Sequence, residues 1–162
     1  MKVIAYQPRF REDFIRLNTA WIEKYFSLEQ EDRELFAHLD ERLRQGAMIF
    51  FAVEDDTVLA TGMVCPLGEG RWEICKLATD EKRQGHGAGS AVFSACMNYA
   101  EKHGAEKLVI LSNTALKPAL HLYSKFGFSE VPVELTHGFS RVDIQLEYDV
   151  EAGKVQQGRK EV

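Results

Sequence analysis

Hydrophobic side chains in the first part of the chain recur at the spacing of amphipathic α-helices. Near the N-terminus they lie three or four positions apart: Phe14, Leu17, Trp21, Ile22 and Tyr25. A second helix is predicted over residues 32–45, where Leu and Phe form a similar stripe and Gly46 provides a natural end. The chain is therefore expected to begin with two helices that each bury one face.

The pattern then changes to the alternation and short apolar runs typical of β-strands. The segments MIFFAVE and TVLATGMV flank Asp55-Asp56 and predict a hairpin, and WEICKLA predicts a third strand after the turn LGEG. Further along, KLVILS has the length and composition of a buried strand. RVDIQLEYDV alternates apolar and polar residues, which predicts a strand with one apolar face.

Two more helices are predicted among these strands. The segment KRQGHGAGSAVFSACMNYAEKHG leads from a glycine-rich loop into a helix that ends at Gly104, and another helix is predicted over residues 116–125. The order of helices, strands, helix, strand, helix and strands predicts an α/β or α+β fold with a mixed sheet. We expect one domain over residues 1–150 and a polar, frayed C-terminal tail over residues 151–162.

Composition excludes several classes of protein. The 162 residues are 45% hydrophobic and 28% charged, which is typical of a globular domain. No apolar run approaches the about 20 residues of a membrane span, and the N-terminus becomes polar too soon for a signal peptide. The three cysteines lack metal-ligand spacing, so we expect no metal, no disulfide framework and a reducing, cytoplasmic location.

The net charge of −5 argues against a nucleic-acid partner, and its distribution is uneven. Residues 1–70 carry eight basic and thirteen acidic side chains, a net charge of −5. Residues 71–150 carry a net charge of −1 and the tail one of +1. A solvated helix face would explain this excess, and so would an electrostatic preference for a cationic partner.

A glycine-rich loop over residues 84–90, QGHGAGS, joins a predicted strand to a helix. Glycines let the backbone approach a ligand closely, and the first N–H groups of the helix favour an anion, so the loop predicts a phosphate cradle. The alternative is a tight strand-to-helix turn. The loop lacks the lysine of a P-loop and the spacing of the dinucleotide fingerprint, so neither of those phosphate-binding motifs is present.

Two segments resemble the GNAT superfamily of N-acetyltransferases. Residues 77–89, LATDEKRQGHGAG, are similar to its acetyl-CoA signature, with Gln84, Gly87 and Gly89 at the key positions. Residues 122–128, LYSKFGF, look like its downstream L-Y-x-K-x-G-F segment. The resemblance implies a single GNAT-like acyl-CoA N-acyltransferase domain over residues 1–150. Its central mixed, mostly antiparallel sheet would be flanked by helices and splayed between strands 4 and 5.

The resemblance also implies acetyl-CoA as co-substrate. Its pyrophosphate would lie on backbone amides of the loop, which by position are Gln84, Gly85, His86, Gly87, Ala88, Gly89 and Ser90. Its pantetheine arm would run beside Leu77, Ala78 and Thr79, and an amide near Leu77 would polarise the thioester carbonyl. Leu116 stands where many members have a CoA-contacting asparagine, and Asn113 is the nearby substitute.

The implied chemistry is direct attack of an amine on the thioester, which needs a base and an acid. Tyr123 matches the family's tyrosine and would protonate the leaving sulfur, although a purely packing role is the alternative. Glu73 is the candidate base, with a surface carboxylate as the alternative, and His121 and His137 are further candidates. No catalytic cysteine is needed, because the cysteines have no evident base beside them.

The acceptor side would come from the first helices and the late strands, including Trp21, Tyr25, Phe26 and Arg141. The acidic first half suits a cationic amine, whereas Arg141 suits a carboxylate-bearing one. The function we predict is N-acetyl transfer to a primary amine of a small molecule or peptide. A catalytically silent acyl-CoA sensor or regulatory module, a transferase for longer acyl groups, and a homodimer paired through RVDIQLEYDV remain open.

Overall fold

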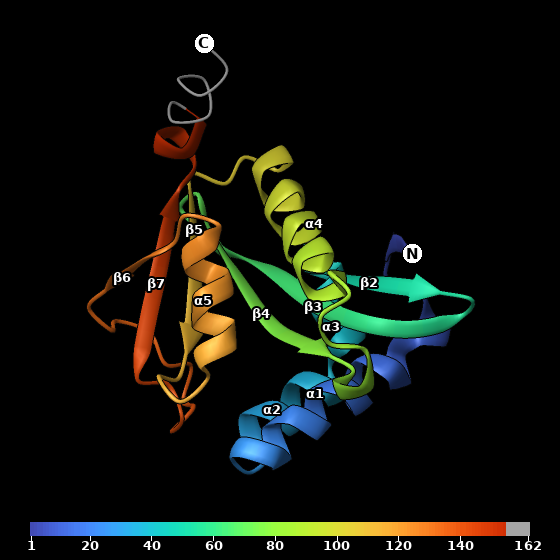
Figure 1. Cartoon of the computed structure of the whole chain (residues 1–162). Helices are drawn as coiled ribbons and strands as arrows, with labels where there is room; N and C mark the ends of the chain where they lie inside the picture. Colours follow the sequence, from blue (N-terminus) through green and yellow to red (C-terminus); the bar gives the residue numbers. More distant parts are fainter. Residues whose placement is uncertain (155–162) are drawn as a thin grey trace.

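A seven-stranded mixed sheet forms the centre of the computed structural model, which describes residues 1–154. The strand order is β1-β2-β3-β4-β5-β7-β6, and neighbours are antiparallel except β4 and β5, which are parallel. Figure 1 shows these strands in sequence colours. Their bounds are β1 Lys2–Ala5, β2 Met48–Glu54, β3 Thr57–Gly68, β4 Arg71–Thr79, β5 Lys107–Ser112, β6 Ser129–Val131 and β7 Ile144–Asp149.

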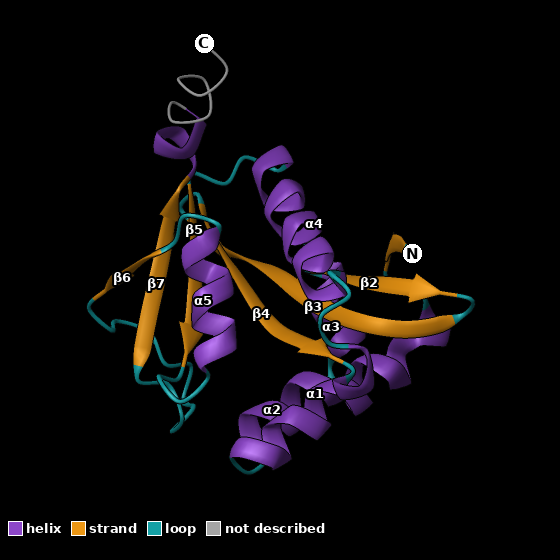
Figure 2. Ribbon diagram, viewed as in Figure 1, coloured by secondary structure: helices purple, strands orange, loops and turns teal. Residues whose placement is uncertain are grey.

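Helices cover both faces of this sheet (Figure 2). The long helix α4 and helix α5 pack on one face, over a core that includes Phe93, Leu108 and Ile110. Helices α1 to α3 pack on the other face, over a core that includes Phe14, Leu39 and Met63. The bounds are η1 Pro8–Phe10, α1 Arg11–Tyr25, α2 Gln30–Ala37, α3 Leu39–Arg44, η2 Glu81–Arg83, α4 Ala88–Lys102 and α5 Lys117–Lys125.

The predicted hairpin, third strand and buried strand are confirmed, and the first, glycine-loop and last helices are found as predicted. The single helix predicted over residues 32–45 is wrong, because it is two helices that break at His38 (φ −117°, ψ 30°). The strand expected in RVDIQLEYDV begins only at Ile144, and the Asp143 carboxylate before it accepts hydrogen bonds from the backbone N–H and hydroxyl of Thr114. Part of the predicted tail, residues 155–162, lies outside the described residues.

A β-bulge in the middle of β4 interrupts the regular pairing of this strand with β3. Thr61 pairs with Ala78 and Met63 pairs with Cys75, so β4 has one extra residue between these pairs. Lys76 takes up the irregularity with a φ of +53°. Lys76 and Leu77 have no partner in the β3–β4 register, and the β4–β5 register ends at Glu73.

Strands β4 and β5 form a parallel pair within an otherwise antiparallel sheet, and their register is short. It consists of three pairs, from Arg71↔Lys107 to Glu73↔Val109, although both strands continue beyond it. Such a short ladder is what a splay between the two strands would produce, and we keep that splay as a prediction. Strand β7 lies between β5 and β6 and pairs with β5 over residues 144–149 and with β6 over residues 145–147; a homodimer through this strand stays a prediction.

Candidate active site

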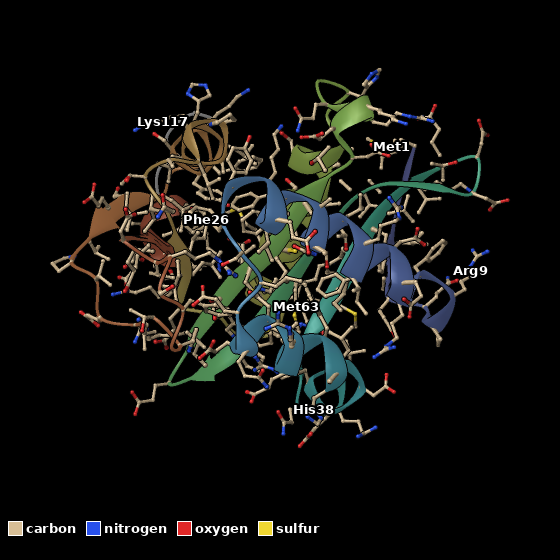
Figure 3. All side chains as sticks on the ribbon, turned by 90° about the horizontal axis from the view of Figure 1, so that it is seen from below. Met1, Arg9, Phe26, His38, Met63 and Lys117 are labelled. Carbon is tan, nitrogen blue, oxygen red and sulfur yellow. The ribbon has the colours of Figure 1, made fainter. Side chains whose placement is uncertain are left out.

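A cavity of about 760 Å³ lies beyond the end of the β4–β5 register. Its walls come from β4 and β5, the second half of α1, the loop before α4, helix α5, and the loop before β7. The extended backbone of β4 beyond Glu73 therefore faces a cavity rather than a neighbouring strand. In Figure 3, Phe26 lies where α1 ends, while Met63 lies beneath the N-terminal helices in the core.

Almost all residues predicted for the site line this cavity. The structure brings together the following predicted residues on its walls: Trp21, Tyr25, Phe26, Glu73, Leu77, Ala78, Thr79, Gln84, Gly85, Gly87, Ala88, Gly89, Ser90, Asn113, Tyr123 and Arg141. His86 does not line it and is exposed, so a contact through its side chain has no support. His121 is also exposed and does not line the cavity.

The glycine loop ends at the N-terminus of α4, where backbone donors are free for an anion. Gly87 is the N-cap with φ +79° and provides no side-chain cap, so the first N–H groups of the helix lack an intrahelical partner. Gly89 packs against β4, since a Cβ there would lie 3.0 Å from the Thr79 hydroxyl. The arrangement leaves the helix N-terminus open to the cavity, with its partial positive charge directed there.

Cationic side chains surround the mouth of the same cavity. The exposed ones on its walls are Arg16, Lys24, Lys82 and Arg83, against the acidic Asp80 and Glu81, whereas Lys76 and Arg141 line it but are largely buried and paired with Asp32. Lys24 at the end of α1 forms an ion pair with Glu81 in η2, which links the two sides of the mouth. A cation-rich lining with an open helix N-terminus suits an anionic ligand.

Tyr123 is buried between α4 and α5 and reaches the cavity. Its ring stacks on Phe93 with centroids 5.5 Å apart, which fixes its position in the core. Burial, with a smaller contribution from Cys75, raises the pKa of Tyr123 well above its ordinary value. The phenol therefore stays protonated at neutral pH and keeps a proton that it can donate.

Asn113 lines the cavity, but its side-chain amide is already used by the protein. Its Nδ2 donates to the Arg141 carbonyl at 2.7 Å and its Oδ1 accepts from the Ala115 N–H at 2.8 Å. The side chain thus holds the loop before β7 against the end of β5. Leu116, at the position of the family's asparagine, lines the cavity with an apolar side chain.

Arg141 belongs to a buried ion-pair network rather than standing free in the cavity. Its Nη1 and Nη2 donate to the two carboxylate oxygens of Asp32 at 2.8 and 2.6 Å, and Nη1 also contacts Glu29 at 3.3 Å. Lys76 donates to the same Asp32 at 2.6 Å. Asp32 is fully buried, so its charge requires both cations, and Arg141 has little capacity left for the carboxylate of an acceptor.

Glu73 lies where the first cavity meets a second one of about 410 Å³. Four residues line both: Glu73, Cys75, Lys76 and Phe139. The Glu73 side chain is 10% exposed, and its Oε1 lies 2.9 Å from Nε2 of His137. The hydrogen bond with Glu73 raises the pKa of His137, an effect that burial partly opposes. The alternative of a solvent-facing strand carboxylate is therefore wrong.

Cys75 also lines both cavities, beside Glu73. Its hydrogen bond with the Cys65 thiol, followed by burial, raises the pKa of Cys75 well above its ordinary value. Because a thiolate is the nucleophilic form, this cysteine is held in its unreactive state. The three cysteines of the chain are free thiols, and burial likewise raises the pKa of Cys96.

Sequence reasoning missed several parts of the site. Lys76 was not expected to turn inward, because alternation along β4 gives no sign of the bulge. The pair of Glu73 and His137 joins residues 64 positions apart, which no local pattern reveals. Arg16 and Lys24 lie on the polar face of α1, so the sequence does not distinguish them from ordinary surface residues.

Two negative observations apply to the described part of the chain. Within residues 1–154, no group of three or more His, Cys, Asp or Glu residues is arranged to hold a metal ion. No helix in that range is long and apolar enough to cross a membrane.

Comparisons with known proteins agree with this architecture. The sequence is 26% identical over 117 residues to the uncharacterized N-acetyltransferase YobR of Bacillus subtilis, a match that covers 70% of this chain. The match spans about half, 47%, of that relative. A GNAT-family acetyltransferase of Staphylococcus aureus Mu50 has the same fold, with a TM-score of 0.82 at 13% identity, over 92% of this chain and 98% of that one.

A further solved structure shares the fold and contains a ligand. It is the acetyltransferase yncA of Salmonella typhimurium with its cofactor acetyl-CoA, with a TM-score of 0.72 at 14% identity, over 93% of this chain and 94% of that one. The sequence model of the acetyltransferase (GNAT) family matches residues 14–128, which include β4, the glycine loop and Tyr123. With most of its length matched in this way, the chain belongs to the GNAT family of acetyltransferases.

Proposed function

We propose that the protein transfers the acetyl group of acetyl-CoA to a primary amine of a small molecule or peptide. The observation that carries this proposal is one cavity that combines an open helix N-terminus, a bulged strand, a protonated Tyr123 and the carboxylate of Glu73. Each of these supplies a different requirement of amine acylation: anion binding, carbonyl polarisation, a proton donor and a proton acceptor.

The residues of the first cavity fit acetyl-CoA, which supplies the acetyl group as a thioester. The backbone N–H groups of residues 87–90 and the side chains of Lys82 and Arg83 would hold its phosphates. Leu77 has no partner in the register of either neighbouring strand, which supports a free N–H toward the thioester carbonyl. The cation-rich mouth suits the negative charge of the phosphates.

The acceptor enters as an ammonium ion and loses two protons during the reaction. Glu73 takes the first, which frees the lone pair of the nitrogen for attack on the carbonyl carbon. The C–N bond forms, the C–S bond breaks, and Tyr123 gives its proton to the departing sulfur. The second nitrogen proton replaces the one lost by Tyr123, and Glu73 gives its proton up to solvent, so the products are an amide, a free thiol and one released proton.

The charge on the second cavity supports a cationic acceptor. Its acidic wall residues are Glu31, Glu34, Glu41 and Glu73, against the basic Arg42 and Lys76. Lys76 is neutralised by Asp32, so the acidic residues dominate. Since Arg141 is also engaged by Asp32, the case for a carboxylate-bearing acceptor is weak. We therefore propose amines with a second positive charge, or lysine side chains in basic peptides, as the acceptor class.

The proposal is tested by release of free CoA from acetyl-CoA with a panel of amines at constant ionic strength. The panel contains diamines, lysine peptides, amino acids and neutral aliphatic amines. We expect release with the first two groups, a higher KM for the others, and a product that gains one acetyl group by mass. Absence of release with every amine would contradict acetyl transfer.

The variant Tyr123→Phe separates an enzyme from an acyl-CoA sensor. Removing the phenol proton should lower transfer by about 100-fold, the lower range for a general acid, while acetyl-CoA affinity by calorimetry stays close to wild type. A wild-type protein that binds acetyl-CoA but never transfers, with Tyr123→Phe indistinguishable from it, would support the sensor. Longer acyl-CoA donors in the same assay test the acyl-chain alternative.

A further inference from the structure

The pair formed by Glu73 and His137 joins the interior of the site to its surface. Glu73 lies on β4 with a side chain 10% exposed, and His137 lies on the loop before β7 with a side chain 38% exposed. Their atoms Oε1 and Nε2 are 2.9 Å apart. Glu73 lines both cavities, whereas His137 lines only the second. The hydrogen bond therefore joins a buried carboxylate at the meeting point of the two cavities to a partly exposed imidazole.

Residues with a strained backbone occur in this pair and close to it in the second cavity. Five non-glycine residues among the described ones have positive φ, and three of them, Asp55, Asp56 and Glu69, lie in the hairpin turns next to β3. The other two are Lys76 (φ +53°) and His137 (φ +52°), which line the second cavity. Strained residues persist only where the surrounding structure requires them, and functional sites are where they gather.

The loop around His137 is fixed by hydrogen bonds. The Gly138 N–H donates to the Thr136 hydroxyl at 3.3 Å, and the Phe139 N–H donates to the Thr136 carbonyl at 2.9 Å. The Ser140 N–H donates to the Glu29 carboxylate at 2.9 Å, which ties the loop to the start of α2. The imidazole is thereby held at Glu73 by the backbone as well as by its own bond.

The other charged and titratable groups around this pair leave the bond itself free of competitors. They come from every element that lines the second cavity: Glu31 and Glu34 from α2, His38, Glu41 and Arg42 with α3, Cys65 from β3, and Cys75 and Lys76 from β4. Arg42 opposes the protonated form of His137, and Lys76 is held by Asp32. His137 is the group that hydrogen-bonds the Glu73 carboxylate.

We propose that His137 is a positioning residue that carries the acceptor's proton from Glu73 to solvent, so that Glu73 and His137 form a proton relay between the two cavities. This inference rests on the proposed acetyl transfer. Glu73 accepts the first proton of the ammonium ion on its carboxylate. Neutral His137 in the tautomer that carries its proton on Nδ1 then takes that proton at Nε2 to form an imidazolium, and the Nδ1 proton passes to solvent. Exchange with solvent moves the remaining ring proton from Nε2 back to Nδ1, which restores the acceptor lone pair. Glu73 is left as a carboxylate for the next turnover, and the proton count balances.

The relay has a signature in its pH dependence. Below the pKa of His137, the imidazole is already protonated and cannot accept a proton from Glu73. Above that pKa, the relay operates. The variant His137→Gln, which keeps a polar side chain but cannot titrate, should therefore match wild type at acidic pH and fall behind as pH rises.

The experiment measures kcat/KM for CoA release by wild type and His137→Gln at a series of pH values with one diamine. The ratio of the two rates cancels the ionisation of the acceptor itself. We expect a ratio near unity at acidic pH that falls to about one tenth above the His137 pKa, a loss at the modest end for assisted proton transfer. His121→Gln, which replaces an exposed histidine outside both cavities, is the matched control and should give a flat ratio near unity.

A second measurement tests the pair without requiring turnover. The pKa of His137, followed by NMR and assigned by its absence in His137→Gln, should fall in Glu73→Gln because the carboxylate no longer stabilises the imidazolium. An unchanged His137 pKa would overturn the relay. A rate ratio that is equally low at every pH would also overturn it, because that indicates a purely structural role. Absence of transfer by wild type with any amine would instead refute the proposed function, and the relay with it.

Discussion

At the scale of single residues, the structure replaces the expected role of Arg141 by a different one. Its guanidinium donates to both oxygens of Asp32 and lies 4.5 Å from the Phe139 ring centroid and 5.7 Å from that of Trp21. These contacts join the loop before β7 to α1 and α2. Arg141 therefore shapes the acceptor side by fixing its wall, and Asp32 is the residue on which this wall depends.

Asp32 makes folding sensitive to acid. Burial raises the pKa of Asp32, but hydrogen bonds from Arg141, Lys76 and the Glu29 N–H together lower it by more. The pKa of Asp32 therefore lies well below its ordinary value. A depressed pKa contributes stability above the unfolded value of about 3.9, and that stability is lost as pH falls through the folded value. Wild type should therefore lose this contribution only in strong acid.

The variant Asp32→Asn should lower the free energy of unfolding by about 3 kcal/mol at neutral pH, because two buried cations lose their partner. The difference from wild type should shrink below pH of about 4, where the stability contributed by the ionised Asp32 carboxylate begins to decrease. Urea unfolding at several pH values measures both effects. Asp40→Asn, on the exposed surface of α3, is the control and should change stability little at any pH. A pH-independent deficit in Asp32→Asn would contradict the assigned charge state.

At the scale of elements, the sequence predicted the segments with strong periodicity and missed the short ones. The stripe of α1, the glycine start of α4 and the hairpin of β2 and β3 are each visible in local spacing. Strands β1 and β6, four and three residues long, are too short to show alternation and form only because a neighbouring strand offers an edge. The break at His38 depends on packing of α2 and α3 against the sheet, which local propensity does not contain.

The same division applies to the candidate site. Residues in one segment, such as the glycine loop and Leu77 to Thr79, could be predicted together because the chain itself keeps them together. The Glu73–His137 bond and the Asp32–Arg141 ion pair join residues 64 and 109 positions apart. These pairs are created by the fold, so the sequence offered the individual residues as candidates but not their partners.

Helix α4 offers a matched test of the anion cradle. Gly87 and Gly104 lie at its two ends with φ values of +79° and +88°, and a Cβ at either would meet no atom within 4 Å. Alanine at either position should therefore cost a similar amount of stability, about 1 kcal/mol, for its left-handed backbone. Only Gly87→Ala should also weaken acetyl-CoA binding, by about tenfold or 1.4 kcal/mol. Calorimetric affinity and thermal unfolding of both variants measure this, and equal affinities would contradict the cradle.

At the scale of the whole molecule, the uneven charge of the sequence acquires a place in the fold. Basic residues around the glycine loop and the end of α1 face the first cavity, and acidic residues of α2 and α3 face the second. The two cavities adjoin along β4, where Glu73, Cys75 and Lys76 line both. An anionic donor and a cationic acceptor would thus be drawn to two adjoining cavities that meet at Glu73, which is an arrangement that suits a transfer between them.

The most direct test of this account is the rate of CoA release by Glu73→Gln at saturating acetyl-CoA and diamine, with acetyl-CoA affinity measured on the same protein. We expect the rate to fall by about 100-fold, because the glutamine cannot accept the acceptor's proton, while the affinity stays within twofold of wild type. A rate close to that of wild type, with acetyl-CoA bound equally well, would contradict the assignment of acetyl transfer to the meeting point of the two cavities.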